Sequence, residues 1–290
     1  MGDFMARKPN KRQFKVSQKL QMAGLAALAA MTVGVVGFAI TDQPDAPPMS
    51  APQATKYLAD AQAKAAAGPT AEPVVDTKAA LAKIQGLIKG NAPLVISVLG
   101  DSTGDKPGEW VDLYAQHLAQ YGTVTLHQWT EGTGDWLPDA KTYPGPDRKI
   151  EIWNGSKPGA SHAYALENLA KIQPVKPTFQ IFNYGHNYLT TRADGGEFDL
   201  VNALAEKWKA STPTVLTLQN VAIGERAPRS ESSQYYIREW ATGKYPVIDV
   251  WTAFKGAKNL SALILADGIG VHPNSGGQKL WVDTVIKTLG

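Results

Sequence analysis

From residue 76 onward, short runs rich in β-branched residues alternate with stretches whose apolar residues recur at helical spacing. The clearest run, Leu94 to Leu99, carries no charge and ends in Gly100, as expected of a strand buried on both faces. Predicted helices over residues 77–89 and 110–121 flank it. Strands separated by helices are joined by right-handed crossovers and form a parallel sheet. The sequence therefore predicts a three-layer α/β/α sandwich with a central parallel sheet.

The same pattern continues to the end of the chain. Strands are predicted over residues 123–129, 150–153, 178–182, 214–218 and 247–250. Helices are predicted over residues 162–172, 198–209, 231–241 and 276–289, and a long loop over residues 130–149. Ligands of such sheets bind beyond the carboxyl ends of the strands. Polar residues directly after each strand are therefore the candidates for chemistry.

Residues 1–19 are basic, and residues 20–40 are apolar and uncharged. At about 1.5 Å per residue, a helix of this length spans about 30 Å, the thickness of a bilayer's hydrocarbon core. Cations before the segment place the N-terminus in the cytoplasm and the remainder outside. A cleaved signal peptide is the second interpretation, because Gly37-Phe38-Ala39 offers small residues for cleavage. The domain is then either membrane-anchored or secreted, and extracytoplasmic in both cases.

Residues 41–75 are dominated by Pro, Ala, Gln and Thr and are predicted to be a linker, because they contain too little apolar surface to fold alone. Residues 76–290 form the folded domain. Residues 41–290 hold 23 basic and 25 acidic residues, so a nucleic-acid partner is not expected.

The chain has no cysteine, which excludes a disulfide scaffold, a thiol nucleophile and an iron–sulfur cluster. It also lacks the H-E-x-x-H pair, the P-loop and a G-x-G-x-x-G turn after a strand. We therefore expect neither a metal nor an organic cofactor. Nothing in the sequence indicates an oligomeric state.

Two strand-end segments contain a candidate nucleophile and a candidate base. Ser102 follows the first strand in Gly100-Asp101-Ser102-Thr103-Gly104, a turn that can expose a hydroxyl and offer N–H groups to an anion. An ordinary turn or helix cap has the same composition. His272 lies in a glycine-rich loop with Asp267 upstream, and an acid in that position can orient an imidazole. A solvated loop histidine is the plainer interpretation.

Two further segments offer hydrogen-bond donors. Asn183-Tyr184-Gly185-His186-Asn187 follows a predicted strand and presents an amide. Residues 154–161 lead into the 162–172 helix, whose N-terminus points N–H groups outward. Both segments also fit plain turns and caps. His127 and His162 are expected to be structural or exposed.

Taken together, and in their order along the chain, the four segments resemble the SGNH/GDSL hydrolase family over residues 91–290. The resemblance implies a flavodoxin-like fold and a serine esterase or lipase. It assigns Ser102 as nucleophile and His272 as base. It assigns the oxyanion hole to the backbone N–H groups of Ser102 and Gly159 and to the amide of Asn187.

Within residues 154–161, Gly155 is a weaker alternative to Gly159 as the oxyanion-hole glycine. The match departs from the family at two points. The family's Gly-x-Asn-Asp pattern is matched by Gly185-His186-Asn187, but Tyr188 stands in place of its last Asp. The family's Asp-x-x-His spacing is absent, because Asp267 lies five residues before the histidine. Two glycines in this loop would let Asp267 reach the imidazole, while a Ser–His dyad or a substitute such as Asp249 are the alternatives.

Residues 100–104 also match the G-x-S-x-G turn of α/β-hydrolases. Those enzymes place several strands before the serine, whereas here it follows the first recognisable strand. The SGNH interpretation is therefore favoured.

The resemblance implies acyl transfer through an acyl-enzyme, acting on carboxylic esters. Export of the domain suggests acyl or acetyl groups on lipids or glycans of the cell envelope. Trp129, Trp136 and Tyr143 are candidates for contacting substrate, although they would equally serve to pack the loop. A non-catalytic carbohydrate-binding or structural descendant of the fold is the alternative function.

Overall fold

The computed structural model describes residues 76–130, 132–188 and 196–290. The predicted basic segment, apolar segment and linker, residues 1–19, 20–40 and 41–75, lie outside the described residues. Within the part of the chain that is described, no helix is both long enough and apolar enough to cross a membrane.

An eight-stranded sheet forms the centre of the domain, in the order β3-β2-β5-β1-β6-β7-β8, with β4 also paired to β2. Six neighbouring strands run parallel, as predicted. The strands are β1 (Leu94–Gly100), β2 (Thr123–Thr130), β3 (Asp135–Trp136), β4 (Lys141–Tyr143), β5 (Lys149–Asn154), β6 (Phe179–Asn183), β7 (Thr214–Leu218) and β8 (Val247–Asp249).

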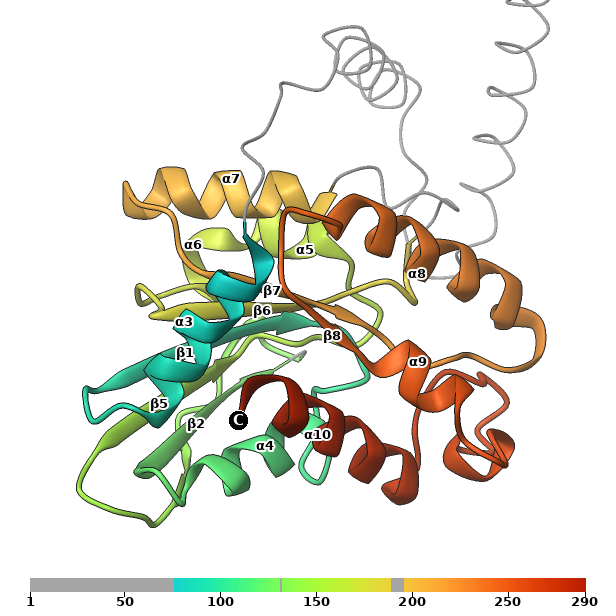
Figure 1. Ribbon diagram of the computed structural model, residues 1–290, viewed down its shortest axis with the longest axis horizontal. Helices are drawn as coiled ribbons and strands as arrows, with labels where there is room; N and C mark the ends of the chain where they lie inside the picture. Colours follow the sequence, from blue (N-terminus) through green and yellow to red (C-terminus); the bar gives the residue numbers. More distant parts are fainter. Residues whose placement is uncertain (1–75, 131, 189–195) are drawn as a thin grey trace, which may run out of the picture. The chain divides into compact units, whose positions relative to one another are not determined.

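Helices cover both faces of this sheet (Figure 1). One buried cluster joins the sheet to α3 (Thr77–Lys89), α4 (Trp110–Leu118), α9 (Val250–Lys255) and α10 (Ser275–Leu289). A second cluster joins it to α5 (His162–Glu167), α6 (Leu169–Ile172), α7 (Gly196–Trp208) and α8 (Ala227–Ala241). Short 3-10 helices follow β7, at Gly224–Arg226, and precede the His272 loop, at Ser261–Leu263. The predicted three-layer α/β/α sandwich is confirmed.

The helix predicted over residues 110–121 ends at Leu118, and the helix predicted over residues 231–241 begins at Ala227. Three further predicted elements differ from the structure. The 130–149 loop contains β3 and β4, which pair antiparallel with β2 and are too short to show a period-2 pattern. The 162–172 helix is divided at Asn168, whose side chain donates to the Tyr164 carbonyl at 2.9 Å and competes with helical hydrogen bonding. Val250 belongs to α9 instead of the preceding strand, because the Asp249 carboxylate accepts from the Thr252 N–H and caps a helix there.

β1 lies at the centre of the sheet, between β5 and β6. In the register of β1 and β6, Gly100 lies opposite Asn183, so the turns after these two strands leave the sheet side by side. A Cβ at Gly100 would lie 2.9 Å from Ser156 Oγ and 3.0 Å from Asn183 Cβ. Three of the four segments singled out in the sequence therefore meet at the carboxyl end of β1, and only glycine leaves room for them.

Candidate active site

Ser102 lies in the turn between β1 and α4 and contacts a histidine far away in the sequence. Its Oγ lies 2.9 Å from Nε2 of His272, in the loop before α10. Both side chains are half-buried, so they remain in reach of solvent. The structure brings the predicted nucleophile and base into hydrogen-bond contact.

Asp267 supports the other side of the imidazole. Its Oδ2 lies 2.5 Å from Nδ1 of His272. A carboxylate accepts hydrogen bonds, so Nδ1 carries the proton and Nε2 presents its lone pair to the Ser102 hydroxyl. This is the tautomer that a general base requires.

The five-residue spacing is accommodated by the backbone of the loop. Gly268 and Gly270 adopt φ of 76° and 77°, a region that other residues rarely enter. The other carboxylate oxygen, Oδ1, accepts from the N–H groups of Ile269 at 2.8 Å and Gly270 at 3.2 Å. The loop thus folds around the carboxylate and presents Oδ2 to the imidazole.

Partial burial acts to raise the pKa of Asp267, but the hydrogen bonds from His272 and from the two backbone N–H groups outweigh it and hold the pKa below its usual value. The carboxylate is therefore ionised at neutral pH and can stabilise an imidazolium.

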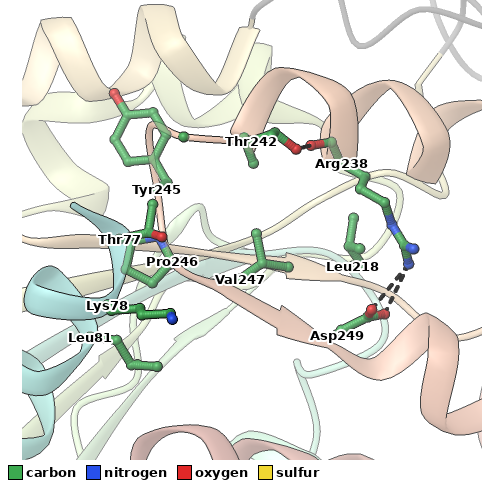
Figure 2. A pocket seen from close by; sticks show the side chains of 12 residues that line it. Thr77, Lys78, Leu81, Leu218, Arg238, Thr242, Tyr245, Pro246, Val247 and Asp249 are labelled. Carbon is green, nitrogen blue, oxygen red and sulfur yellow. Dashed lines mark hydrogen bonds and ion pairs between the residues drawn. The ribbon is translucent and has the colours of Figure 1, made fainter. Parts of the chain in front are cut away.

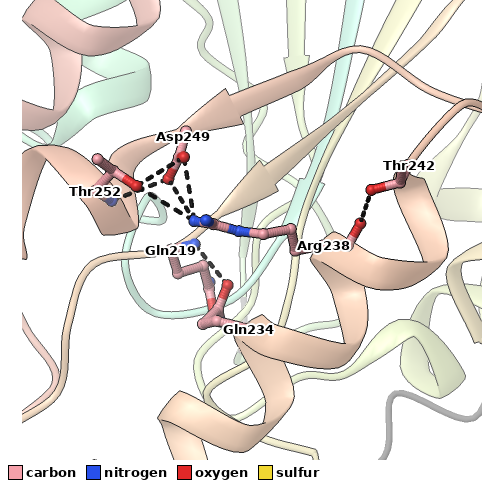
Figure 3. Close-up of polar contacts among 6 residues, drawn as sticks. All are labelled: Gln219, Gln234, Arg238, Thr242, Asp249 and Thr252. Carbon is pink, nitrogen blue, oxygen red and sulfur yellow. Dashed lines mark hydrogen bonds and ion pairs between the residues drawn. The ribbon is translucent and has the colours of Figure 1, made fainter.

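Asp249, considered as a substitute acid, has different partners. It caps α9 through Thr252 and pairs with Arg238 at 3.1 Å, as Figure 3 shows. Figure 2 shows it in the wall of an open pocket of about 450 Å³ beside the edge strand β8. Both carboxylate oxygens are engaged by Arg238 and Thr252, and Asp267 is the carboxylate at the imidazole.

The predicted oxyanion donors come from three chain segments. In the described part of the chain, the N–H groups of Ser102 and Gly159 make no hydrogen bond. Asn187 Nδ2 lies 3.3 Å from Asp101 Oδ2 and 3.2 Å from the Ala160 carbonyl, so the amide joins the serine turn to the Gly159 segment. The Gly155 N–H is already bonded to the Val98 carbonyl at 2.8 Å, which removes the weaker alternative.

The three aromatic candidates are engaged by the protein itself. Trp129 is 97% buried and its indole donates to the hydroxyl of Tyr164. Trp136 packs edge-on against it and donates to the Lys171 carbonyl. The hydroxyl of Tyr143 bonds to Asp112 of α4. The packing interpretation fits all three, because Trp129 and Trp136 pack against each other and Tyr143 packs against α4.

A buried polar cluster, which was not predicted from the sequence, lies beneath the serine turn. The Asp101 carboxylate, fully buried, accepts from the N–H and hydroxyl of Thr103 and from Nε2 of Gln219 at 2.9 Å. Gln219 also donates to the Asn183 carbonyl and accepts from the N–H of His186. Gln219 directly follows β7, a position where polar residues were expected to carry chemistry, but it was not among the four segments named from the sequence.

His186 is 97% buried and has a partner at each ring nitrogen. Ser230 Oγ lies 2.9 Å from Nδ1, and Asn220 Oδ1 lies 3.1 Å from Nε2. Burial lowers the pKa of His186, so the ring is neutral.

Among the described residues, no group of three or more His, Asp or Glu side chains is arranged to hold a metal ion.

Comparisons with known proteins show which solved structures have a similar fold. No family model and no curated protein matches the sequence. Axe2, an acetylxylan esterase from Geobacillus stearothermophilus, is structurally similar at 15% identity and a TM-score of 0.51, over 70% of this chain and 96% of that chain. A lipase/acylhydrolase from Enterococcus faecalis matches at 20% identity and a TM-score of 0.49, over 67% and 94%. The described domain has the SGNH/GDSL hydrolase fold that the sequence motifs predicted.

The neutral buried His186 gives a testable pH dependence of stability. Below about pH 6.5 the unfolded chain binds a proton that the folded His186 rejects, so the free energy of unfolding falls as pH falls, by at most about 1.4 kcal/mol per pH unit for this group. The charge of Asp101 acts to raise the pKa of His186, and His272 and Arg226 act to lower it. The free energy of unfolding, measured by urea titration at several pH values between about 7 and 5.5, should depend less steeply on pH in His186→Gln than in wild type. Parallel slopes would contradict a neutral His186.

Proposed function

We propose that this chain is a serine hydrolase that cleaves carboxylic esters through an acyl-enzyme. The observation that carries the proposal is the continuous contact from Ser102 Oγ through the imidazole of His272 to the Asp267 carboxylate, at 2.9 and 2.5 Å. A domain retained only as a binding module or structural element would have no need of this arrangement. The SGNH/GDSL hydrolase fold supports the same conclusion.

The first half of the reaction forms the acyl-enzyme. Ser102 Oγ attacks the ester carbonyl while its proton passes to Nε2 of His272, and the carbonyl π electrons move onto oxygen. Asp267 stabilises the imidazolium that results. Collapse of the tetrahedral intermediate expels the alcohol oxygen, which takes the proton from Nε2. Water then repeats the sequence on the acyl-enzyme and releases the acid.

Negative charge on the tetrahedral oxygen needs donors that are not already committed. The N–H groups of Ser102 and Gly159 are uncommitted in the described part of the chain. The Asn187 amide makes two long hydrogen bonds, and a charged oxyanion is a stronger acceptor than the neutral Ala160 carbonyl. Loss of one such donor typically costs about 10² to 10³ in rate.

The proposed substrate class is acyl or acetyl esters on lipids or glycans of the cell envelope. The apolar segment at residues 20–40 supports an extracytoplasmic location. The acetylxylan esterase that shares the fold supports a glycan ester. Turnover of p-nitrophenyl acetate beside longer acyl esters, and acetate release from an acetylated glycan, would separate glycan from lipid substrates.

Ser102 should be the residue that a fluorophosphonate labels. Wild-type protein is expected to label and to hydrolyse p-nitrophenyl acetate, whereas Ser102→Ala should do neither, because the nucleophilic oxygen is gone. Ser233→Ala, which removes a fully buried hydroxyl of α8, is the matched control and should still label. Equal labelling of wild type and Ser102→Ala would refute the assignment.

Asp267→Asn should retain the fold and lower kcat by about 10² to 10⁴, because an amide no longer requires the proton on Nδ1 and the productive tautomer is lost. Asp249→Asn is the matched control at an acid that does not contact the imidazole. Its main effect should be a lower melting temperature and not a lower kcat, because Asp249 pairs with Arg238. Circular dichroism would establish that both are folded. Undiminished kcat in Asp267→Asn would favour the Ser–His dyad.

We propose further that residues 1–75 deliver and tether the domain and take no part in the chemistry. Removal of these residues should leave a monodisperse domain with the kcat of the detergent-solubilised full chain. Mass analysis of the mature protein from membranes would show whether its first residue is Met1 or whether it has been cleaved after Ala39. Aggregation or loss of activity in residues 76–290 would contradict the proposed division.

A further inference from the structure

The loop that carries Asp267 and His272 is attached to the segment after β7 by two hydrogen bonds. The Ile223 N–H donates to the Gly270 carbonyl at 2.8 Å, and Asn220 Nδ2 donates to the Val271 carbonyl at 2.9 Å. Val271 immediately precedes His272 in the chain. The Asn220 side chain is fully buried and therefore fixes the peptide group next to the base.

The orientation of the Asn220 amide follows from its partners. Nδ2 lies 3.1 Å from the Val221 carbonyl and 2.9 Å from the Val271 carbonyl, both of which only accept. The nitrogen must therefore face these carbonyls, which turns Oδ1 toward Nε2 of His186 at 3.1 Å. His186 consequently donates from Nε2, and its Nδ1 accepts from the hydroxyl of Ser230.

Every donor in this series points the same way. The hydroxyl of Ser230 donates to His186, His186 donates to Asn220, and Asn220 donates to the Val271 carbonyl. Aligned hydrogen bonds polarise and strengthen one another in a buried setting. Reversal of any one of them would leave two acceptors or two donors in contact.

His186 also connects this series to the other parts of the site. Its backbone N–H donates to Gln219 Oε1 at 2.8 Å, and Gln219 Nε2 holds the Asp101 carboxylate beside Ser102. The next residue is Asn187, the proposed oxyanion donor. A Cβ at Gly185 would lie 2.1 Å from Gln234 Nε2, so a side chain at this position would displace Gln234.

We propose that Asn220 and His186 are positioning residues that hold His272 in reach of Ser102 through the Val271 carbonyl. The inference rests on the proposed esterase function and deepens it. Neither residue touches the reacting atoms. Their effect is on the placement of Nε2, and a displacement of about 1 Å at such a point can cost about 10²-fold in rate.

Asn220→Asp tests the proposal, because it turns the donor that faces Val271 and Val221 into a carboxylate oxygen facing two carbonyls. With p-nitrophenyl acetate at about pH 8, kcat should fall about 10- to 100-fold while KM changes less than about twofold. Fluorophosphonate labelling of Ser102 should slow in parallel.

Gln173→Glu is the matched control. Gln173 is also fully buried, and its Nε2 donates to the Val175 carbonyl at 2.8 Å, in the segment before the amino end of β6. The control should lose a similar amount of thermal stability and keep the wild-type kcat. Loss of kcat in both variants to the same extent would reduce Asn220 to a structural role and overturn the proposal.

If Asn220→Asp does not fold, a second pair of variants at His186 tests the same proposal. His186→Gln keeps an N–H that can reach Asn220, whereas His186→Leu has none. We expect the Gln variant to retain kcat within about threefold and the Leu variant to lose about tenfold or more at equal KM. Equal kcat for the two would refute the proposal. If wild type neither labels nor turns over, the esterase function itself fails, and the inference fails with it.

Discussion

A fully buried carboxylate, that of Asp101, organises this end of the sheet. An isolated charge in such a position costs several kcal/mol unless donors surround it. The donors come from Thr103 in its own turn, from Gln219 after β7 and from Asn187 after β6. Because one carboxylate requires all of them, the turns after three parallel strands are held in one arrangement, and Ser102 is held with them.

The base is placed by a different device. The loop before α10 folds around the Asp267 carboxylate, whose two oxygens are divided between backbone N–H groups and the imidazole. Two glycines with positive φ make the longer spacing possible, and a Cβ at Gly270 would lie 2.5 Å from the Ile223 carbonyl oxygen. The close approach to the segment after β7 and the reach of the acid are therefore set by the same residue.

These two devices meet in the residues after β7. Gln219 belongs to the cluster that holds the serine turn, and Asn220 belongs to the series that holds the histidine loop. His186 contacts both, through its backbone N–H and its ring. A neutral ring suits this place, because one nitrogen must donate and the other must accept, which a protonated imidazole does not allow. The site is thus assembled from the turns after β1, β6 and β7 and from the loop before α10, which share buried hydrogen bonds.

The sequence by itself determined the layers, the parallel strands and the four segments that carry polar residues, because hydrophobic period and strand-end position are local signals. The contact of Asp267 with His272 was expected from its glycines but depends on a loop packed against Ile223, which no local pattern encodes. The packing of Trp129 against Trp136 and the pairing of the short strands β3 and β4 with β2 were decided by the tertiary structure, whereas the helix break at Asn168 follows from a local hydrogen bond to the Tyr164 carbonyl. The roles of Gln219 and Asn220 emerged only from the structure, because a buried amide is defined by partners far away in the chain, 118 residues away at Asp101 and 51 at Val271.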